Sequence, residues 1–534
     1  MRLICLLFLV ISLTGCYQNK ALTQNTLIYC TESLPSSFNP LISHDVASLD
    51  ATTHQLFNRL VKIDEETNQF VPDLAEKWEQ SEDKLRYRFT LRSDVHFHHT
   101  DYFTPTRTLN ADDVLFSLNR MLDKNNPYHF INNQGNNFFY NHPFTNLLSE
   151  INKIDDLTIE FVLLKPDVTL LANLAAHYSV IHSKEYADQL LAQGTPKNID
   201  FEPIGTGPFK FKQYDNNGTI RYSKHSLFAQ KTGNIDNLIY FTNTSASKRY
   251  TKLLSGECDA ISYPAASQLE TISENENVSI ISKVSANLAL WAFNTSKPTL
   301  QDHRVRQAIS KAINVKTILN AVYFQSALQT KTLLNKQSWA LKANIDETLF
   351  APEQARQTLQ SLDYDFSKVL TILVPESGDT FNPNFHKTAE LIQANLAAIG
   401  IQAQIINLSG KALKDRLKNG DYDTYLTGIN VHINDPDSIF RPLLSCNSTP
   451  NTGNSSHWCS DETQSLLDAS LTEPDFAQRI KNYYKIQVIT REQRPYLPIA
   501  HVLRLDAVSN TISNIEVNPL TGINFQYAIK QDLK

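Results

Sequence analysis

Residues 388–427 decide the fold class, and they read TAELIQANLAAIGIQAQIINLSGKALKDRLKNGDYDTYLT. Apolar residues recur at helical spacing from Thr388 to Ile399, and Gly400 can take the left-handed conformation that ends a helix. The next residues alternate as a strand does, with apolar side chains at Ile401, Ala403 and Ile405. A second helix over 411–418 precedes a second strand over 422–427. Helices and strands in alternation indicate an α/β domain with strands buried in a sheet.

The N-terminal half alternates in the same way. Leu85–Leu91 alternates apolar and polar residues at period two, as a half-buried strand does. The next helix begins after Asn110, which can cap it, and Asp112 and Asp113 suit the positive end of the helix dipole. Upstream, Leu34–Pro40 combines prolines with short polar side chains, which favours an exposed loop with free backbone groups.

The composition describes a large chain without a basic block. The 534 residues are 41% hydrophobic, enough for more than one domain with a buried core. The formal charge is −6 and charges of both signs are interspersed, which argues against a dedicated nucleic-acid binder. We find no internal repeat and no long Gly/Ser linker, so we expect domains that share crossing segments.

The first residues predict export. Arg2 precedes an apolar run over Leu3–Leu13, which is shorter than the roughly 20 residues that a membrane-spanning helix needs. The run ends in Leu13-Thr14-Gly15-Cys16, which resembles the lipobox of bacterial lipoproteins. We therefore expect a lipoprotein signal peptide over 1–16, lipidation at Cys16, and membrane attachment through that anchor alone. The alternatives are an ordinary secretory signal with an incidental cysteine and an uncleaved anchor.

Four cysteines remain after the signal segment, and an even number in an oxidising compartment favours two disulfides. They are Cys30, Cys258, Cys446 and Cys459. Three pairings are open, and the local pair Cys446 with Cys459 leaves Cys30 with Cys258. The chain-entropy model gives about 3 kcal/mol for the short loop and roughly 5 kcal/mol for the long one.

Motifs of catalysis are absent from the sequence. It contains no Gly-x-Ser-x-Gly, no His-Glu-x-x-His and no phosphate-binding Gly-rich loop. His96-Phe97-His98-His99 could place two imidazoles on one strand face, but it lacks nearby Cys or Glu partners for a metal. Asp435 and Asp437 flank a proline, and we interpret them as loop-shaping residues. We expect neither an enzyme nor a bound cofactor or metal.

Several stretches together resemble the peptide/nickel/haem-type solute-binding family of ABC importers over nearly the whole chain after the signal segment. They are Pro72–Trp78, Leu109–Ser117, Pro203–Phe209, Phe293–Thr295 and Val305–Ile309. Finer features resemble a branch named for sensitivity to antimicrobial peptides. These are Tyr102–Arg107, Leu253–Asp259 with Tyr263–Leu269, and Asn434–Cys446. The cysteine spacing resembles that of dipeptide binders in the family, which supports the pairing of Cys30 with Cys258 and of Cys446 with Cys459.

The resemblance implies a two-lobed α/β fold, the type II (cluster C) periplasmic-binding-protein fold, with an extra subdomain in lobe I. Lobe I would take residues 25–284 and 503–534, with the extra subdomain near 58–205, and lobe II residues 285–502. A hinge of crossing segments would close the lobes over a ligand. The implied partners are a peptide ligand and an inner-membrane ABC permease, and we expect a monomer.

The same resemblance implies ligand-binding positions. In dipeptide-binding relatives an Asp pairs with the ligand's amino terminus, an Arg with its carboxylate, and a Trp stacks on it. Carried over, these positions fall on His432, on Asp379 and near Ile429. The further candidate ligand-binding residues are Ser36, Ser37, Phe381, Asn430 and Asn434.

Neither end of a free dipeptide would then meet its usual counter-charge. Burying an unpaired ammonium or carboxylate costs several kcal/mol, so a simple dipeptide is disfavoured. His432 could instead contact a different ligand in a pH-dependent way, because histidine titrates near ~6.5. The alternative is a solvated or hydrogen-bonded loop residue. The leading ligand is a larger peptide, including cationic antimicrobial peptides, and haem is the alternative within the family. Outside the family, an exported hydrolase or a lipid-tethered adhesin or chaperone remains open.

Overall fold

The computed structural model describes residues 25–43, 45–64, 67–131, 143–215, 217–343 and 349–531. The predicted signal segment 1–16 and Cys16 lie outside the described residues. None of the helices in the described ranges is long and apolar enough to cross a membrane.

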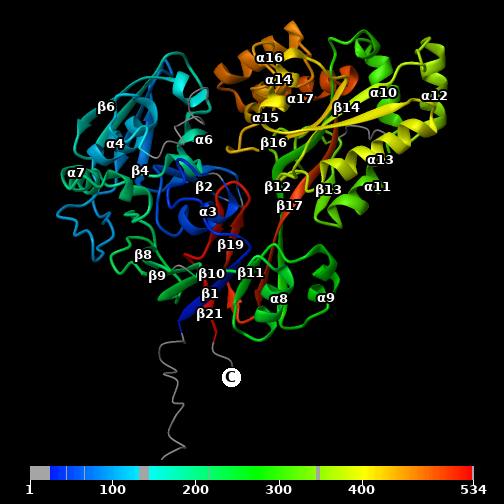
Figure 1. Cartoon of the computed structure of the whole chain (residues 1–534). Helices are drawn as coiled ribbons and strands as arrows, with labels where there is room; N and C mark the ends of the chain where they lie inside the picture. The colour runs from blue at the N-terminus through cyan, green and yellow to red at the C-terminus, as the bar shows by residue number, and fades with distance from the viewer. Residues whose placement is uncertain are drawn as a thin grey trace, which may run out of the picture.

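One large mixed sheet runs through the molecule (Figure 1). Its eleven strands follow the order β15-β14-β16-β12-β17-β11-β1-β10-β9-β8, with β13 added on β17. The strand bounds are β1 Thr26–Thr31, β8 Phe209–Tyr214, β9 Thr219–Lys224, β10 Asn237–Thr242, β11 Ala260–Ser262, β12 Val278–Phe293, β13 Ala327–Gln329, β14 Leu370–Pro375, β15 Ala403–Leu408, β16 Thr424–Ile429 and β17 Tyr496–Ser509. Strands on both sides of the central pair β12 and β17 give the fold its two lobes. This confirms the predicted two-lobed α/β fold.

The central pair β12 and β17 belongs to both lobes. Near one end, residues 278–284 of β12 pair with 503–509 of β17, beside β11 and β1 of lobe I. Near the other end, residues 288–293 pair with β16 and with 496–501, in lobe II. Between the pairs Val284–Leu503 and Leu288–His501, the ladder breaks its register. The two lobes are therefore joined by two hydrogen-bonded strands. Their ladder shifts register once between the lobes and a second time between Ala289 and Leu290, within lobe II.

Lobe I also carries a four-stranded antiparallel sheet in the order β4-β5-β7-β6. Side chains of β5 alternate between exposed and buried, as the period-two pattern of Leu85–Leu91 predicts. Asn110 caps α4 in a capping box with Asp113, which confirms the predicted helix start. The bounds are β4 Ala75–Gln80, β5 Arg86–Leu91, β6 Leu148–Asp155, β7 Thr158–Leu163, α4 Ala111–Leu122, α6 Leu170–Leu174 and α7 Lys184–Ala192.

Short elements complete lobe I. They are α3 Val46–Thr52, β2 Val61–Ile63, β3 Phe70–Pro72, α8 Ala246–Leu254, α9 Leu269–Ser273, β18 Ile512–Ser513, β19 Glu516–Asn518, β20 Gly522–Asn524 and β21 Ile529–Lys530. The C-terminal strand β20 packs beside α3 and pairs with β19, so the end of the chain returns to its beginning.

Lobe II is a sheet covered by helices on both faces. Along β12, Trp291 and Phe293 face a core with α10, α11, α12 and α13, while Leu288 and Leu290 face a core with α14, α15, α16 and α17. Figure 1 shows these two groups of helices on opposite sides of the lobe II strands. The bounds are α10 His303–Lys311, α11 Val315–Ile318, α12 Pro352–Ser361, α13 Phe385–Ala398, α14 Gly410–Asn419, α15 Asp437–Leu444, α16 Asp461–Thr472 and α17 Phe476–Gln493.

The stretch 388–427 folds as predicted, with shifted boundaries. Helix α13 begins at Phe385 rather than at Thr388, because Asn384 caps it by accepting the backbone N–H of Lys387. Gly400 has φ +90° and ends this helical segment as expected. Strand β16 begins two residues later than the pattern indicates, at Thr424.

Both predicted disulfides are present. Cys30 in β1 bonds to Cys258, and Cys446 bonds to Cys459. The first bridge is buried among Tyr250, Leu253 and Ile261. The second closes a loop after α15 and leaves Cys459 exposed. The predicted pairing is confirmed.

Candidate ligand-binding site

A cavity of 230 Å³ lies between the lobes. Lobe I contributes the segment His54–Asp73, part of α6 and the C-terminal segment Glu516–Tyr527, and lobe II contributes the loop His432–Asn434. Its polar and charged lining residues are His54, Asn58, Arg59, Lys62, Asp64, Asp73, His432, Asn434, Glu516, Asn518, Thr521, Asn524 and Gln526. A cavity with walls from both lobes is the arrangement that a ligand can close by bridging them.

Arg59 is the most deeply buried cation of the cavity wall, with 3% of its surface exposed. It follows Leu56 and Phe57 on the segment between α3 and β2, and these apolar neighbours anchor that segment in the lobe I core. The Nε and Nη1 atoms of Arg59 have no hydrogen-bond partner among the described residues. Burial lowers the pKa of the guanidinium from its ordinary value, and the nearby Asp73 opposes that shift.

The carboxylate of Asp73 is committed to other donors. Its Oδ2 accepts the backbone N–H of Arg59 at 3.0 Å, and its Oδ1 accepts the side-chain amides of Asn58 at 3.1 Å and Gln230 at 2.9 Å. Asp73 therefore holds the backbone of the Arg59 segment in place. The Arg59 side chain is left facing the cavity.

His54 lines the same wall in its neutral form. Its Nε2 lies 2.7 Å from the hydroxyl of Thr521. Burial lowers the pKa of His54 well below its usual value, and the positive charges of Arg59 and Lys62 lower it further. The positive charge of this wall therefore comes from Arg59 and Lys62.

The predicted residues His432 and Asn434 lie at the cavity, on the loop that follows β16. The His432 ring contacts the ring of His177 in lobe I at 5.5 Å between centroids. The Asn434 side-chain amide donates to the Asn68 side chain at 3.3 Å. Both residues thus sit where the two lobes meet.

Buried ion pairs hold this loop. Asp435 pairs with Arg479 at 2.8 Å, and Asp437 pairs with Arg441 at 2.7 Å. Burial raises the pKa of Asp437 to about 6, although Arg441 opposes the shift. The interpretation of Asp435 and Asp437 as loop-shaping residues agrees with these contacts.

The other predicted residues of lobe II gather around the turn at 379–382 and the end of β16. Asp379 is exposed in a turn that pairs with Asn382, and the hydroxyl of Thr380 donates to the Asn430 side chain at 2.8 Å. Phe381 is 7% exposed and packs over Gly428, where an added Cβ would lie 2.2 Å from the ring. Ile429 is partly buried at the end of β16. None of Asp379, Phe381, Ile429 and Asn430 is among the residues that line the cavity.

Ser36 and Ser37 are tied into their own loop. The Ser36 hydroxyl donates to Asp45 at 2.5 Å, at the start of α3. Ser37 is buried, and its hydroxyl accepts the backbone N–H of Asn39 at 3.1 Å. Neither serine is among the residues that line the cavity. Phe38 and Asn39, which follow them, are buried, so the predicted exposed loop is exposed only over its first residues.

The histidine cluster at 96–99 lies in a loop, so the strand face that could have presented two imidazoles to a metal is not formed. His98 is fully buried, its Nδ1 accepts the backbone N–H of Gly205 at 3.3 Å, and its Nε2 lies 3.0 Å from the Gly207 carbonyl. The ring of His225 packs against it and also contacts the Gly207 carbonyl, at 3.1 Å. These imidazoles are structural, and burial lowers the pKa of both.

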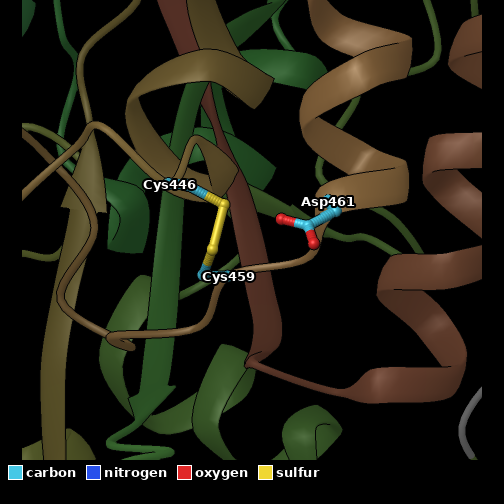
Figure 2. Close-up of side chains that lie close together, drawn as sticks. All are labelled: Cys446, Cys459 and Asp461. Atoms are coloured by element: carbon cyan, nitrogen blue, oxygen red, sulfur yellow. A yellow bond between two sulfur atoms is a disulfide. The ribbon is translucent and has the colours of Figure 1, made fainter.

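One cluster in the described part of the chain has the residue types and spacing of a metal site. It consists of Cys446, Cys459 and Asp461 (Figure 2). Figure 2 shows the two sulfur atoms joined in the disulfide, with the Asp461 carboxylate beside it. Because thiolates are the metal-binding form of cysteine, the disulfide removes both sulfur ligands. The cluster therefore does not provide a zinc-type donor set.

Comparison with known proteins identifies the family. The sequence model of the family of bacterial extracellular solute-binding proteins, family 5, matches residues 69–451. The chain belongs to this family. It is 35% identical to the probable ABC transporter periplasmic-binding protein SapA of Escherichia coli, over 95% of this chain and 92% of that protein. The peptide transport periplasmic protein SapA of Salmonella typhimurium is 36% identical, over 93% and 90%. The predicted resemblance to the Sap branch is confirmed.

Two further members of the family are also similar. Heme-binding protein A of Haemophilus influenzae is 34% identical over 96% of this chain and 94% of its own length. The structure of HbpA2 from Haemophilus parasuis superposes with a TM-score of 0.90 at 33% identity, covering 95% of this chain and all of that one. The two-lobed arrangement therefore matches that of a solved relative over nearly its whole length.

Sequence reasoning missed Arg59, His54 and Lys62. A signal for Arg59 was present, because it is a charged residue within the apolar run Leu56–Val61. A charge in such a run is buried with a partner or serves a site. Only the structure shows that the Nε and Nη1 atoms of this guanidinium lack a partner among the described residues and that Arg59 lines a cavity.

Proposed function

We propose that this protein is the solute-binding subunit of a peptide-type ABC importer, which captures peptides in the periplasm and delivers them to an inner-membrane permease. The observation that carries the proposal is the cavity with walls from both lobes. The peptide transport protein SapA of Salmonella typhimurium, at 36% identity, supports the substrate class. The role is binding, not catalysis.

Capture follows from hinge closure around the crossing strands. A ligand that contacts lobe I and the 432–434 loop together binds the closed form more tightly, and so shifts the population toward it. The register break between Val284 and Leu288 supports a lobe I of residues 25–284 and 503–534 and a lobe II of residues 285–502, with an extra subdomain near 58–205. The four-stranded sheet supports that subdomain.

The ligand is a peptide longer than a dipeptide, and cationic antimicrobial peptides are the leading class. His432 and Asn434 contact it from lobe II, and the group formed by Asp379, Phe381, Ile429 and Asn430 extends the binding surface beside the cavity. Ser36 and Ser37 contribute through the backbone of their loop. The absence of the usual counter-charges at His432 and Asp379 supports the exclusion of dipeptides.

The protein works as a monomer tethered through a lipidated Cys16. Support comes from the Leu13–Cys16 motif and the short apolar run before it. Mass spectrometry of the mature N-terminus tests this, since a diacylated Cys16 is expected and an unmodified N-terminus contradicts it.

Haem is the second candidate ligand. Two histidines, His54 and His432, line the cavity, and imidazole is the commonest protein ligand of haem iron. A Soret shift on adding haem that disappears in a His432→Ala variant supports this candidate. A shift that persists in the double variant His54→Ala/His432→Ala contradicts iron ligation by the cavity histidines.

The main test is calorimetric titration of the full chain with a cationic peptide and a neutral peptide of equal length. We expect measurable affinity for the cationic peptide and compaction by small-angle scattering. Equal weak heats and unchanged scattering contradict the proposal. A His432→Asp variant, which restores the carboxylate of dipeptide binders, should change the ligand profile, and an unchanged profile removes a specificity role for His432.

A further inference from the structure

Arg59 is a charged residue that is almost completely buried. It is 3% exposed, its Nε and Nη1 have no hydrogen-bond partner in the described part of the chain, and it lines the cavity between the lobes. Buried polar groups are nearly always paired, because an unpaired buried charge is strongly destabilising. Arg59 is therefore a candidate for a contact with a bound ligand.

The surroundings do not supply the missing partner. Asp73 is the nearby acid, but its two oxygens accept the Arg59 backbone and the amides of Asn58 and Gln230. Burial lowers the pKa of Arg59. Arg306 differs from Arg59 in its hydrogen bonds. It is 1% exposed, and its guanidinium donates to the carbonyls of Leu300 and Gln301 at 2.6 Å and 2.8 Å.

We infer that Arg59 binds a carboxylate of the captured ligand, such as the C-terminal carboxylate of a peptide or a propionate of haem. Guanidinium is the donor of choice for a carboxylate, because its fork of N–H groups matches the two oxygens. The inference rests on the proposed function of ligand capture and names a specific contact for it.

The charge layout of the cavity agrees with this assignment. Arg59 and Lys62 are its cations, and His54 beside them is held neutral. Of the acids on the same wall, Asp73 is committed as described, Asp64 accepts the Thr67 backbone and hydroxyl at 2.9 Å and 2.7 Å, and Glu516 accepts the Asn524 amide at 2.8 Å. The carboxylate anchor therefore lies in lobe I, opposite the loop of His432.

This location explains how the protein can dispense with a lobe II arginine. Asp379 occupies the position that the resemblance assigns to the carboxylate partner, and an acid there repels a ligand carboxylate. With Arg59 as partner, the acid group of the ligand enters at the lobe I side of the cavity. The rest of the ligand then extends toward lobe II.

The test uses the full chain and two matched pairs of probes. The first pair is the peptide Lys-Ala-Lys-Ala-Ala with a free C-terminal carboxylate and the same peptide as its C-terminal amide. The second pair is haem and haem dimethyl ester, which lacks free propionates. We expect the wild-type protein to prefer the acid of the pair it recognises by roughly 10- to 100-fold, the range of a charged hydrogen bond. Which pair shows the preference identifies the source of the carboxylate.

Variants separate a ligand contact from a structural role. Arg59→Gln should abolish the preference, and Arg59→Lys should retain part of it because the positive charge remains. Arg59→Gln should also raise the midpoint of thermal unfolding of the ligand-free protein, since it removes an unpaired buried charge. The control Arg306→Gln should lower that midpoint, because its guanidinium is satisfied.

The outcomes distinguish this inference from the proposed function. Equal binding of acid and blocked probes by the wild-type protein overturns the role of Arg59 and leaves peptide capture standing. Binding of none of the four probes overturns both the proposed ligands and the role of Arg59 as their carboxylate partner. A lower unfolding midpoint or failure to fold in both Arg59→Gln and Arg59→Lys shows a structural arginine and overturns the inference.

Discussion

Removing the disulfide between Cys30 and Cys258 should destabilise the protein more than removing the one between Cys446 and Cys459. The first joins residues 228 apart in sequence and the second residues 13 apart. In the chain-entropy model the stabilisation grows with the logarithm of the loop length, which gives about 5 kcal/mol for the long loop and about 3 kcal/mol for the short one. Burial of Cys30 and Cys258 adds to the difference.

The comparison uses the double variants Cys30→Ala/Cys258→Ala and Cys446→Ala/Cys459→Ala, measured by scanning calorimetry and urea unfolding. Each bridge lies within one lobe, so the first variant should shift the unfolding of lobe I and the second that of lobe II. Equal losses of unfolding free energy would refute the loop-length argument. A shift of the same transition by both variants would show that the lobes unfold as one cooperative unit.

Three further predictions concern acid sensitivity, a glycine and the loop at the cavity. Acidification from pH 6.5 to 4 should lower the unfolding free energy by about 3 kcal/mol for each of His225 and His501. Burial lowers the pKa of both to about 4, whereas in the unfolded chain they bind protons near ~6.5. Urea unfolding across this pH range measures the loss, and His225→Asn should make the unfolding free energy depend less on pH. Gly428→Ala should lower stability by about 1–3 kcal/mol, because the new Cβ would meet the ring of Phe381 at 2.2 Å; thermal unfolding measures the loss, and Gly428→Ala should cost less stability in a Phe381→Ala background, which lacks that ring. Arg479→Leu should lower the unfolding free energy by about 3–5 kcal/mol, because it leaves the buried carboxylate of Asp435 without its partner at 2.8 Å. Denaturant unfolding should show that a second change, Asp435→Asn, largely relieves this loss.

The parts of the fold that follow from local chemistry were predictable. Helix α13, its end at Gly400 and the capping box at Asn110 depend on neighbouring residues, so periodicity and capping residues indicate them. The strand order of the large sheet does not follow from local chemistry, because β12 and β17 pair across about 200 residues of sequence. Boundaries shifted where a cap outside the periodic pattern took effect, as Asn384 did.

The candidate site was predictable only in part. The family resemblance pointed to the loop of His432 and Asn434, and that loop lies at the cavity. Whether these residues contact the ligand stays a prediction. Arg59 escaped notice because the property that marks it is an unfilled hydrogen-bonding capacity. That property depends on what folds around the residue, and no spacing in the sequence encodes it.

The paired strands β12 and β17 determine how the molecule can move. Because the two strands are bonded to each other along both lobes, stretching or sliding the connection would break ladder hydrogen bonds, whereas twisting it preserves them. The angle of twist about these strands is therefore the coordinate along which the lobes can move at the least cost in ladder hydrogen bonds. A permease that docks on both lobes could read occupancy from that angle alone, without touching the cargo, and cargoes of different sequence would give the same signal.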